Sequence, residues 1–242
     1  MIILFTGGLY ALLIALLYRH LRCLFAEERR PLQDEPMVSV IIAIRNEAPH
    51  LIDCLESLAA LDYPRDRLEI ILIDDGSSDG SAELLHDFHD RHPWVQAIRL
   101  EGDAKQLPGK AGAVYRGITG SRGEIIAMTD ADCRVPPGWI RHLLAAFDDG
   151  VGLVGGFTFL ESTARKRTCF EAVQALDWLF LLGIAAAAIK MGKPLTWMGN
   201  NMAFRRRAYE DVGGYPALGH NLIEDFALLN AISRETEWKV RI

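Results

Sequence analysis

The sequence predicts a doubly wound α/β fold, in which helices flank both faces of a mostly parallel sheet. This prediction rests on three apolar, β-branched runs of strand length: VSVIIAI at 38–44, LEIILI at 68–73 and EIIAMT at 124–129. Unbroken apolar runs of this kind are typical of parallel strands that are buried on both faces. Helical patterns separate the runs, so we expect right-handed crossovers between neighbouring strands.

Strands and helices alternate along most of the chain. The segment 170–194 is predicted to form a long helix. It contains an uninterrupted apolar stretch, 178–189, which is too short to cross a bilayer. We therefore expect that helix either in the core or in a membrane interface. In chain order the predicted elements are strand 38–44, a helix within 45–61, strand 68–73, helix 81–92, strand 95–100, helix 110–118, strand 124–129, strand 151–160 and helix 170–194.

The N-terminal stretch MIILFTGGLYALLIALLY, residues 1–18, carries no charged side chain. It is close to the span of about 20 residues that a bilayer requires, and it lacks the basic start and cleavage site of a secretory signal. We expect a transmembrane anchor at 1–20, in preference to a core helix, and a polar linker at 21–37. Arg19 and Arg22 follow the apolar stretch, so the catalytic domain is expected at the cell membrane, facing the cytoplasm.

The composition excludes a general affinity for nucleic acid. The chain of 242 residues has 26 basic and 32 acidic residues and a formal net charge of −6. A basic surface would be needed to attract a polyphosphate backbone. The four cysteines show no paired spacing, which predicts reduced thiols in place of a disulfide framework or a zinc site.

Two adjacent carboxylates, Asp74 and Asp75, end the second strand in the stretch IILIDDGSSDGS. Ligands bind at the carboxyl ends of strands in sheets of this kind. Two like charges at the end of an apolar run are costly unless a ligand or a cation offsets them. The same residues also suit an ordinary turn between strand and helix. The sequence leaves both interpretations open.

A second acidic pair, Asp130 and Asp132, ends the strand at 124–129. Residues separated by one position in an extended segment point the same way, so both carboxylates can face one cation. Oxygen ligands favour Mg²⁺ or Mn²⁺ over zinc. Lys110 opens a helix between the two acidic pairs, where its charge suits a phosphate, although a solvated helix start explains it equally well.

A third acidic pair, Glu224 and Asp225, opens a predicted helix. Acidic residues at a helix start commonly complement the helix dipole. Such a carboxylate can also serve as a general base that takes a proton from an attacking hydroxyl. Further along the chain, the run Arg205 to Arg207 is expected either to clamp a phosphate or, preferably, to lie on a surface near the membrane.

Six stretches of the sequence resemble the motifs of a known family, in the same order along the chain. They are VSVIIAIRNEA, IDDGSSDGS, PGKAGAVYRG, TDADC, GNNMAFRR and IEDFAL. The chain is similar to the family 2 inverting glycosyltransferases of GT-A fold. The resemblance is greatest to the membrane-bound branch with the cellulose, hyaluronan and ceramide glycosyl synthases. It covers residues 38 to about 230, and the ordered set is far more specific than any single motif.

The resemblance implies a role for each matching position. Asp75 would recognise the nucleotide base with Asp74 beside it, and Lys110 would contact the diphosphate. The GNN turn, 199–201, would line the acceptor side. Four residues would flank the base, largely through their backbone atoms: Ala43, Arg45, Asn46 and Glu47.

The resemblance also implies the chemistry. Asp130 and Asp132 match the DXD motif, with Asp132 the more direct ligand of Mg²⁺ or Mn²⁺. Asp225 matches the catalytic base of the ED motif, and Glu224 would support the acceptor pocket.

The sequence therefore predicts a metal-dependent, inverting glycosyltransferase. The expected donor is a UDP-sugar, and the expected acceptor is a hydroxyl of a lipid or a polysaccharide. We expect a nucleotide-sugar-binding half at 38–150 and an acceptor-binding half at 151–242. The latter is expected to be C-terminally truncated, because a Q/R-x-x-R-W motif usually follows in the membrane branch. The alternatives are a nucleotidyltransferase and a non-catalytic membrane scaffold that has kept the fold.

Overall fold

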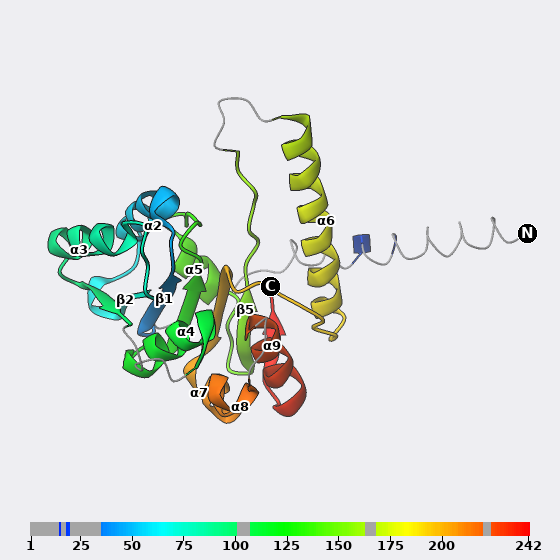
Figure 1. The fold of residues 1–242 in the computed structure, drawn as a ribbon. Coiled ribbons are helices and arrows are strands. Elements are labelled where there is room, and N and C mark those ends of the chain that lie inside the picture. The colour runs from blue at the N-terminus through cyan, green and yellow to red at the C-terminus, as the bar shows by residue number, and fades with distance from the viewer. Residues whose placement is uncertain (1–14, 16–17, 20–34, 101–106, 163–167, 220–223) are drawn as a thin grey trace, which may run out of the picture.

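The chain forms an α/β fold built on one sheet (Figure 1). The computed structural model describes residues 15, 18, 19, 35–100, 107–162, 168–219 and 224–242. The described residues include a seven-stranded sheet of order β3-β2-β1-β4-β6-β5-β7. The predicted α/β class is thus confirmed. The predicted anchor at 1–20 and linker at 21–37 lie almost entirely outside the described residues.

The first four strands form the parallel part of the sheet. β1 pairs in parallel with both β2 and β4, and β2 pairs in parallel with β3. Every residue of β2 and β4 is buried, as the unbroken apolar runs predicted. These strands are β1 (Val38–Ile44), β2 (Leu68–Asp74), β3 (Val95–Arg99) and β4 (Ile125–Thr129).

The other part of the sheet is mixed. β6 (Asn201–Arg205) runs antiparallel between β4 and β5 (Val151–Gly155), and β5 pairs in parallel with β7 (Lys239–Arg241). The strand β6 was not predicted from the sequence. The predicted strand at 151–160 was too long, because the chain leaves the sheet after Gly155. Strands from both predicted halves, 38–150 and 151–242, belong to this one sheet.

Helices connect the strands and cover the sheet. α4 packs against β1 and β2, so its first turn lies near the carboxyl ends of these strands. The helices are α2 (Ala48–Ala59), α3 (Ser81–Arg91), α4 (Gly109–Gly120), α5 (Trp139–Leu144), α6 (Cys169–Lys190), α7 (Arg206–Asp211), α8 (Gly214–Leu218) and α9 (Glu224–Glu235), with a 3₁₀ turn η1 (Arg65–Arg67).

The predicted helix at 170–194 is observed as α6, Cys169–Lys190, which ends four residues earlier than predicted. Among the described helices it alone is long and apolar enough to cross a membrane, judged by length and composition only, and 39% of its apolar window is buried. Its second half packs in the core through Leu182, Ala186 and Ile189, whereas its first half is largely exposed. The predicted core position therefore fits the second half of α6, whereas the exposed first half leaves room for the predicted interfacial position.

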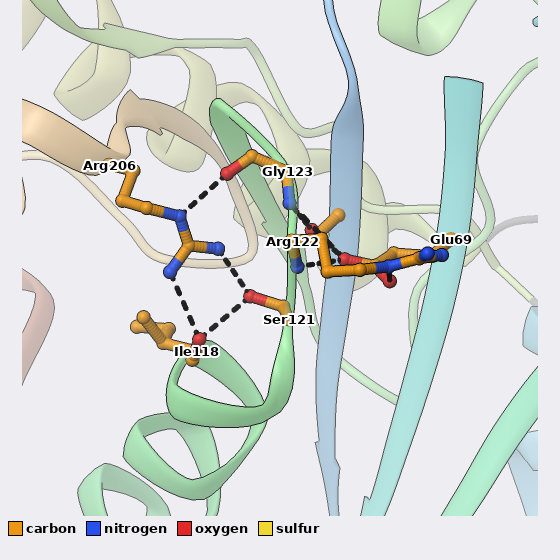
Figure 2. A network of polar contacts seen from close by, with 7 residues as sticks. Glu69, Ile118, Ser121, Arg122, Gly123 and Arg206 are labelled. Atoms are coloured by element: carbon orange, nitrogen blue, oxygen red, sulfur yellow. Dashed lines mark hydrogen bonds and ion pairs between the residues drawn. The ribbon is translucent and has the colours of Figure 1, made fainter.

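A polar network fixes the turn between α4 and β4 at the amino ends of β1, β2 and β4 (Figure 2). The buried carboxylate of Glu69 accepts hydrogen bonds from the Ser39 hydroxyl at 2.5 Å and from the backbone N–H groups of Arg122 and Gly123. Burial alone would raise the pKa of Glu69, but these hydrogen bonds and the Arg122 guanidinium lower it overall. The network keeps a buried charge satisfied.

Arg206 completes this network from the other side of the turn (Figure 2). Its guanidinium donates to the carbonyl oxygens of Gly123 and Ile118, at 2.7 and 3.1 Å, and to Ser121 Oγ at 2.6 Å. Arg205 pairs with Glu124 at 3.0 Å. Two of the three arginines in this run therefore hold the fold together, which neither interpretation of the run had predicted.

Candidate functional site

A small cavity of about 240 Å³ lies at the carboxyl ends of β1, β2 and β4. It is the place at which doubly wound sheets bind ligands. Seven predicted site residues line it: Ala43, Arg45, Glu47, Asp75, Lys110, Asp130 and Asp132. The tertiary structure thus brings together side chains from the loops after three different strands.

The two adjacent carboxylates at the end of β2 are offset by protein groups. Asp74 and Asp75 are only 2% and 3% exposed. Arg99 Nε lies 3.6 Å from Asp74 Oδ2, and Arg45 Nη1 lies 3.5 Å from Asp75 Oδ2. The backbone N–H of Ser77 also donates to Asp74 Oδ1 at 2.9 Å. Asp74 is therefore buried and stabilises the loop after β2, whereas Asp75 lines the small cavity.

The loops after β1 and β2 are joined by hydrogen bonds. Asn46 adopts a positive φ of 58°, and its Oδ1 accepts from the Ser78 N–H at 2.8 Å. The Asn46 N–H in turn donates to Ser77 Oγ at 3.0 Å. The turn interpretation of the DGSSDG stretch is therefore correct for these residues. Asn46 shapes the loop and is absent from the described lining of the small cavity.

Lys110 links the acidic groups of the site. Its Nζ lies 2.6 Å from Asp130 Oδ1 and 3.7 Å from Glu224 Oε1. Burial would lower the pKa of Lys110, but the carboxylates of Asp130, Asp225 and Glu224 raise it overall. The lysine therefore stays charged and half-buried between chain segments that are far apart in the sequence.

Asp225 is the most buried acidic group near Lys110 at the start of α9. It is 9% exposed, and its Oδ1 has no hydrogen-bond partner within the described part of the chain. Burial raises the pKa of Asp225 to about 6, against the opposing charge of Lys110 and a hydrogen bond from the Gly199 N–H. A carboxyl group of this kind can exchange a proton near neutral pH.

Gly199 allows the close approach that this hydrogen bond needs. A Cβ atom at position 199 would lie 2.0 Å from Asp225 Oδ2, so any side chain there would displace the carboxylate. The neighbouring residues Asn200 and Asn201 line a second cavity. The GNN turn thus connects Asp225 with that cavity, although Glu224 and Asp225 are not among the described lining residues of either cavity.

The second, large cavity has a volume of about 980 Å³. Asp130 and Asp132 line both cavities, so the two spaces adjoin at these carboxylates. Its wall includes Trp178 of α6, whose Nε1 donates to the Thr158 carbonyl oxygen at 2.8 Å. Three lining residues, Arg134, Thr158 and Glu161, were not assigned to the site from the sequence, because they lie in irregular segments after β4 and β5.

The carboxylates of Asp130 and Asp132 supply only some of the ligands that a divalent cation needs. The described residues contain no group of three or more His, Cys, Asp or Glu side chains that could hold a metal ion. Asp130 is engaged by Lys110, whereas Asp132 is exposed between the two cavities. Mg²⁺ sites commonly use one or two carboxylates and take their remaining ligands from substrate phosphates and water. The residues present fit that arrangement.

Comparisons with known proteins identify the family of the chain. The family model described as "Glycosyl transferase family 2" matches residues 39–213. "Probable glycosyltransferase YdaM" of Bacillus subtilis (strain 168) is 26% identical over 217 residues, which are 88% of this chain and 48% of the relative. "Beta-monoglucosyldiacylglycerol synthase" of Synechocystis sp. is 28% identical over 217 residues, which are 86% of this chain and 42% of the relative. The chain thus spans about half the length of these curated relatives.

A solved structure shares the fold. It is that of the mannosyltransferase PcManGT from Pyrobaculum calidifontis in complex with GDP-Man and Mn²⁺. The TM-score is 0.72 at 22% sequence identity, and the match covers 99% of this chain and 64% of that chain. At this identity the likeness shows a common fold.

Proposed function

The chain belongs to glycosyl transferase family 2, and from this premise we propose that it transfers a sugar from a nucleoside diphosphate sugar to a hydroxyl acceptor. One observation supports this proposal above the others. Asp75, Asp130 and Asp132 line the small cavity together with Lys110, whose ammonium group also pairs with Glu224 at the start of α9. The large cavity adjoins this one at Asp130 and Asp132. A transferase needs two adjoining spaces, one for each substrate.

The small cavity suits the nucleoside diphosphate. Asp75 and the backbone of residues 43–47 would face the base, and Lys110 would contact the diphosphate. Lysine is a common phosphate ligand, and the first turn of α4 adds backbone N–H groups. We propose a UDP-sugar as the donor. The related fold with GDP-Man bound makes a GDP-sugar the first competitor to test.

Asp132, with Asp130 beside it, would hold Mg²⁺ or Mn²⁺. Such a cation stabilises negative charge on a departing diphosphate when it is bound. The related solved structure contains Mn²⁺. Glu47 lies near Asp132, and burial together with the charge of Asp132 raises the pKa of Glu47.

Asp225 would act as the general base for the acceptor. The pKa of about 6 keeps most of this carboxyl group ionised at neutral pH while leaving it basic enough to accept a proton. The acceptor oxygen would attack the anomeric carbon in one in-line displacement, which inverts its configuration. Glu224 would position the acceptor pocket and Lys110 through its 3.7 Å ion pair.

We also propose the place of the protein in the cell. The apolar stretch 1–18 would anchor the chain in the cell membrane, and the basic residues after it would keep the catalytic domain in the cytoplasm. The Synechocystis relative is named for a glucosylated diacylglycerol. A lipid is accordingly the first acceptor to test, and a polysaccharide the second.

Donor binding by calorimetry tests the proposal. The full chain should bind UDP-glucose or UDP-N-acetylglucosamine more tightly with Mn²⁺ than without it. Asp132→Asn should abolish this metal-dependent gain, whereas Glu56→Gln, on the exposed face of α2, should leave it unchanged. An unaltered gain in Asp132→Asn would refute the metal assignment. Release of UDP on addition of an acceptor would distinguish the enzyme from a scaffold.

A further inference from the structure

We propose that the acceptor in the large cavity is an uncharged amphiphile, a hydroxyl compound that carries an apolar chain and no phosphate or carboxylate. This inference rests on the proposed function, because it assigns the large cavity to the acceptor. It adds the chemical class of that acceptor. Two independent features of the cavity support it, the charge of its lining and the apolar surface at its rim.

The lining of the large cavity is acidic. Four carboxylates line it, those of Asp53, Asp130, Asp132 and Glu161. Arg134 is the sole lysine or arginine among the described lining residues. An anionic acceptor would meet like charges on several sides, which disfavours its binding.

Arg134 is already committed to two of these carboxylates. Its Nη1 lies 3.7 Å from Asp53 Oδ2, and its Nη2 is in contact with Glu161 Oε2. Asp53 belongs to α2, whereas Glu161 belongs to the segment after β5, so the ion pairs join two walls of the cavity. A phosphate or carboxylate on the acceptor would have to displace them before it could use Arg134.

Binding of the donor and its cation changes the net charge around the large cavity little. The diphosphate is negative and a divalent cation at Asp132 is positive, so the two together add little net charge. Lys110 lines the small cavity and is not among the described lining residues of the large one. The cavity therefore still favours an uncharged acceptor when both substrates are present.

The rim of the large cavity is apolar. Phe159 and Leu160 line the cavity and are 69% and 42% exposed, respectively. Their segment lies beside the first half of α6, as Figure 1 shows. Hydrogen bonds from Trp178 Nε1 to the Thr158 carbonyl oxygen and from Ser162 Oγ to Glu171 Oε1 join the two.

An exposed apolar surface continues from this rim along α6. It consists of Phe170, Val173, Leu176, Phe180 and Leu181, each more than half exposed. At 100° per residue these positions fall within an arc of about 140° on the helix. The one acidic residue within that arc is Asp177, which again disfavours an anionic partner. This surface can accept the apolar chain of a compound whose hydroxyl end enters the cavity.

Calorimetry with three ligands tests the inference. The full chain, loaded with UDP and Mn²⁺ so that no turnover occurs, is titrated below the micellar concentration with octyl β-glucoside, its 6-phosphate or methyl β-glucoside. We expect octyl β-glucoside to bind at least about tenfold more tightly than either of the other two, which is about 1.4 kcal/mol. Equal or tighter binding of the 6-phosphate, or no binding of octyl β-glucoside, would overturn the inference.

Variants of the ion pairs sharpen this test. Asp53→Asn with Glu161→Gln removes two negative charges and frees Arg134, so the 6-phosphate should bind about tenfold more tightly than to the parent chain. Glu56→Gln, also on α2 but outside the cavity, should change nothing. Binding of UDP is measured separately. If UDP does not bind, the proposed function fails. If UDP binds but the preference for the uncharged ligand is absent, only this inference fails.

Discussion

At the residue scale, Lys110 and Asp225 depend on each other's charge. Lys110 lowers the pKa of Asp225, and burial raises it further than the lysine lowers it, to about 6. Gly199 permits the close approach of its backbone to Asp225, because a side chain there would occupy the position of the carboxylate. The pKa of Asp225 therefore depends on a lysine and a glycine that lie outside α9.

Replacement of the proposed base should separate binding from transfer. In Asp225→Asn the amide cannot accept the proton of the acceptor hydroxyl, so kcat should fall by about 10²–10⁴-fold. Donor affinity, measured by calorimetry, should change little because Asp225 does not line the small cavity. A variant with near-normal kcat would show that another group accepts the proton.

The rate of transfer should depend on pH through this carboxyl group. Asp225 accepts a proton only when ionised, so kcat should be constant well above pH 6 and should fall about tenfold per unit below it. The residual activity of Asp225→Asn should lack this acidic limb. Initial rates between pH 4.5 and about 8 would test the dependence, and an unchanged limb in the variant would assign it to a different group.

At the element scale, α4 is held at both ends. Its first turn places Lys110 between Asp130 and Glu224, and its last turn is held by Arg206 (Figure 2). The segment after β5 is likewise held against α6 by the hydrogen bonds of Trp178 and Ser162. Lys110 and the cavity-lining segment after β5 thus lie on elements that are fixed by polar contacts with other parts of the chain.

Loss of the Arg206 guanidinium should destabilise the fold. Arg206→Ala leaves the carbonyl oxygens of Gly123 and Ile118 without this donor, and we expect a loss of about 2–3 kcal/mol in the free energy of unfolding. Arg207→Ala, at the exposed neighbouring position, should cost less than about 0.5 kcal/mol. Urea denaturation of both variants measures the difference. Equal stabilities would contradict the role of Arg206.

At the scale of the whole molecule, two apolar features bear on the membrane. One is the N-terminal stretch 1–18, and the other is the exposed first half of α6. Exposed apolar surfaces of this kind commonly mark sites of interaction with proteins, ligands or membranes. The two features can be tested separately, because they are far apart along the chain.

Deletion of residues 1–20 should release the protein from the membrane fraction of cells that express it. The apolar stretch would contribute most of the insertion energy, since a span is held far more strongly than an interfacial helix. The double variant Val173→Ser with Leu176→Ser, which keeps the stretch, should stay in the membrane fraction. If the deletion variant stays bound and this double variant is released, α6 is the principal anchor. Immunoblots of both fractions provide the measurement.

The sequence by itself determined the fold class, most of the elements and the family. The largely apolar runs at 38–44 and 68–73 were confirmed as buried parallel strands, because a strand covered on both faces carries apolar side chains at most positions. The buried polar exceptions, Ser39 and Glu69, are hydrogen-bonded to each other. The match to glycosyl transferase family 2 and the shared fold of the mannosyltransferase confirmed the resemblance and the GT-A-like architecture. Three of the ordered motifs, VSVIIAIRNEA, IDDGSSDGS and TDADC, begin in a buried strand and continue past its carboxyl end.

Only the tertiary structure decided how these parts meet. It placed β6 antiparallel between β4 and β5, paired Lys110 with Asp130 and Glu224, and used Arg206 as a structural clamp. It also joined Arg134 to Asp53 and Glu161 across the large cavity. The reason is physical: periodicity reports which side of one element is buried, whereas ion pairs and cavities depend on contacts between elements distant in the chain.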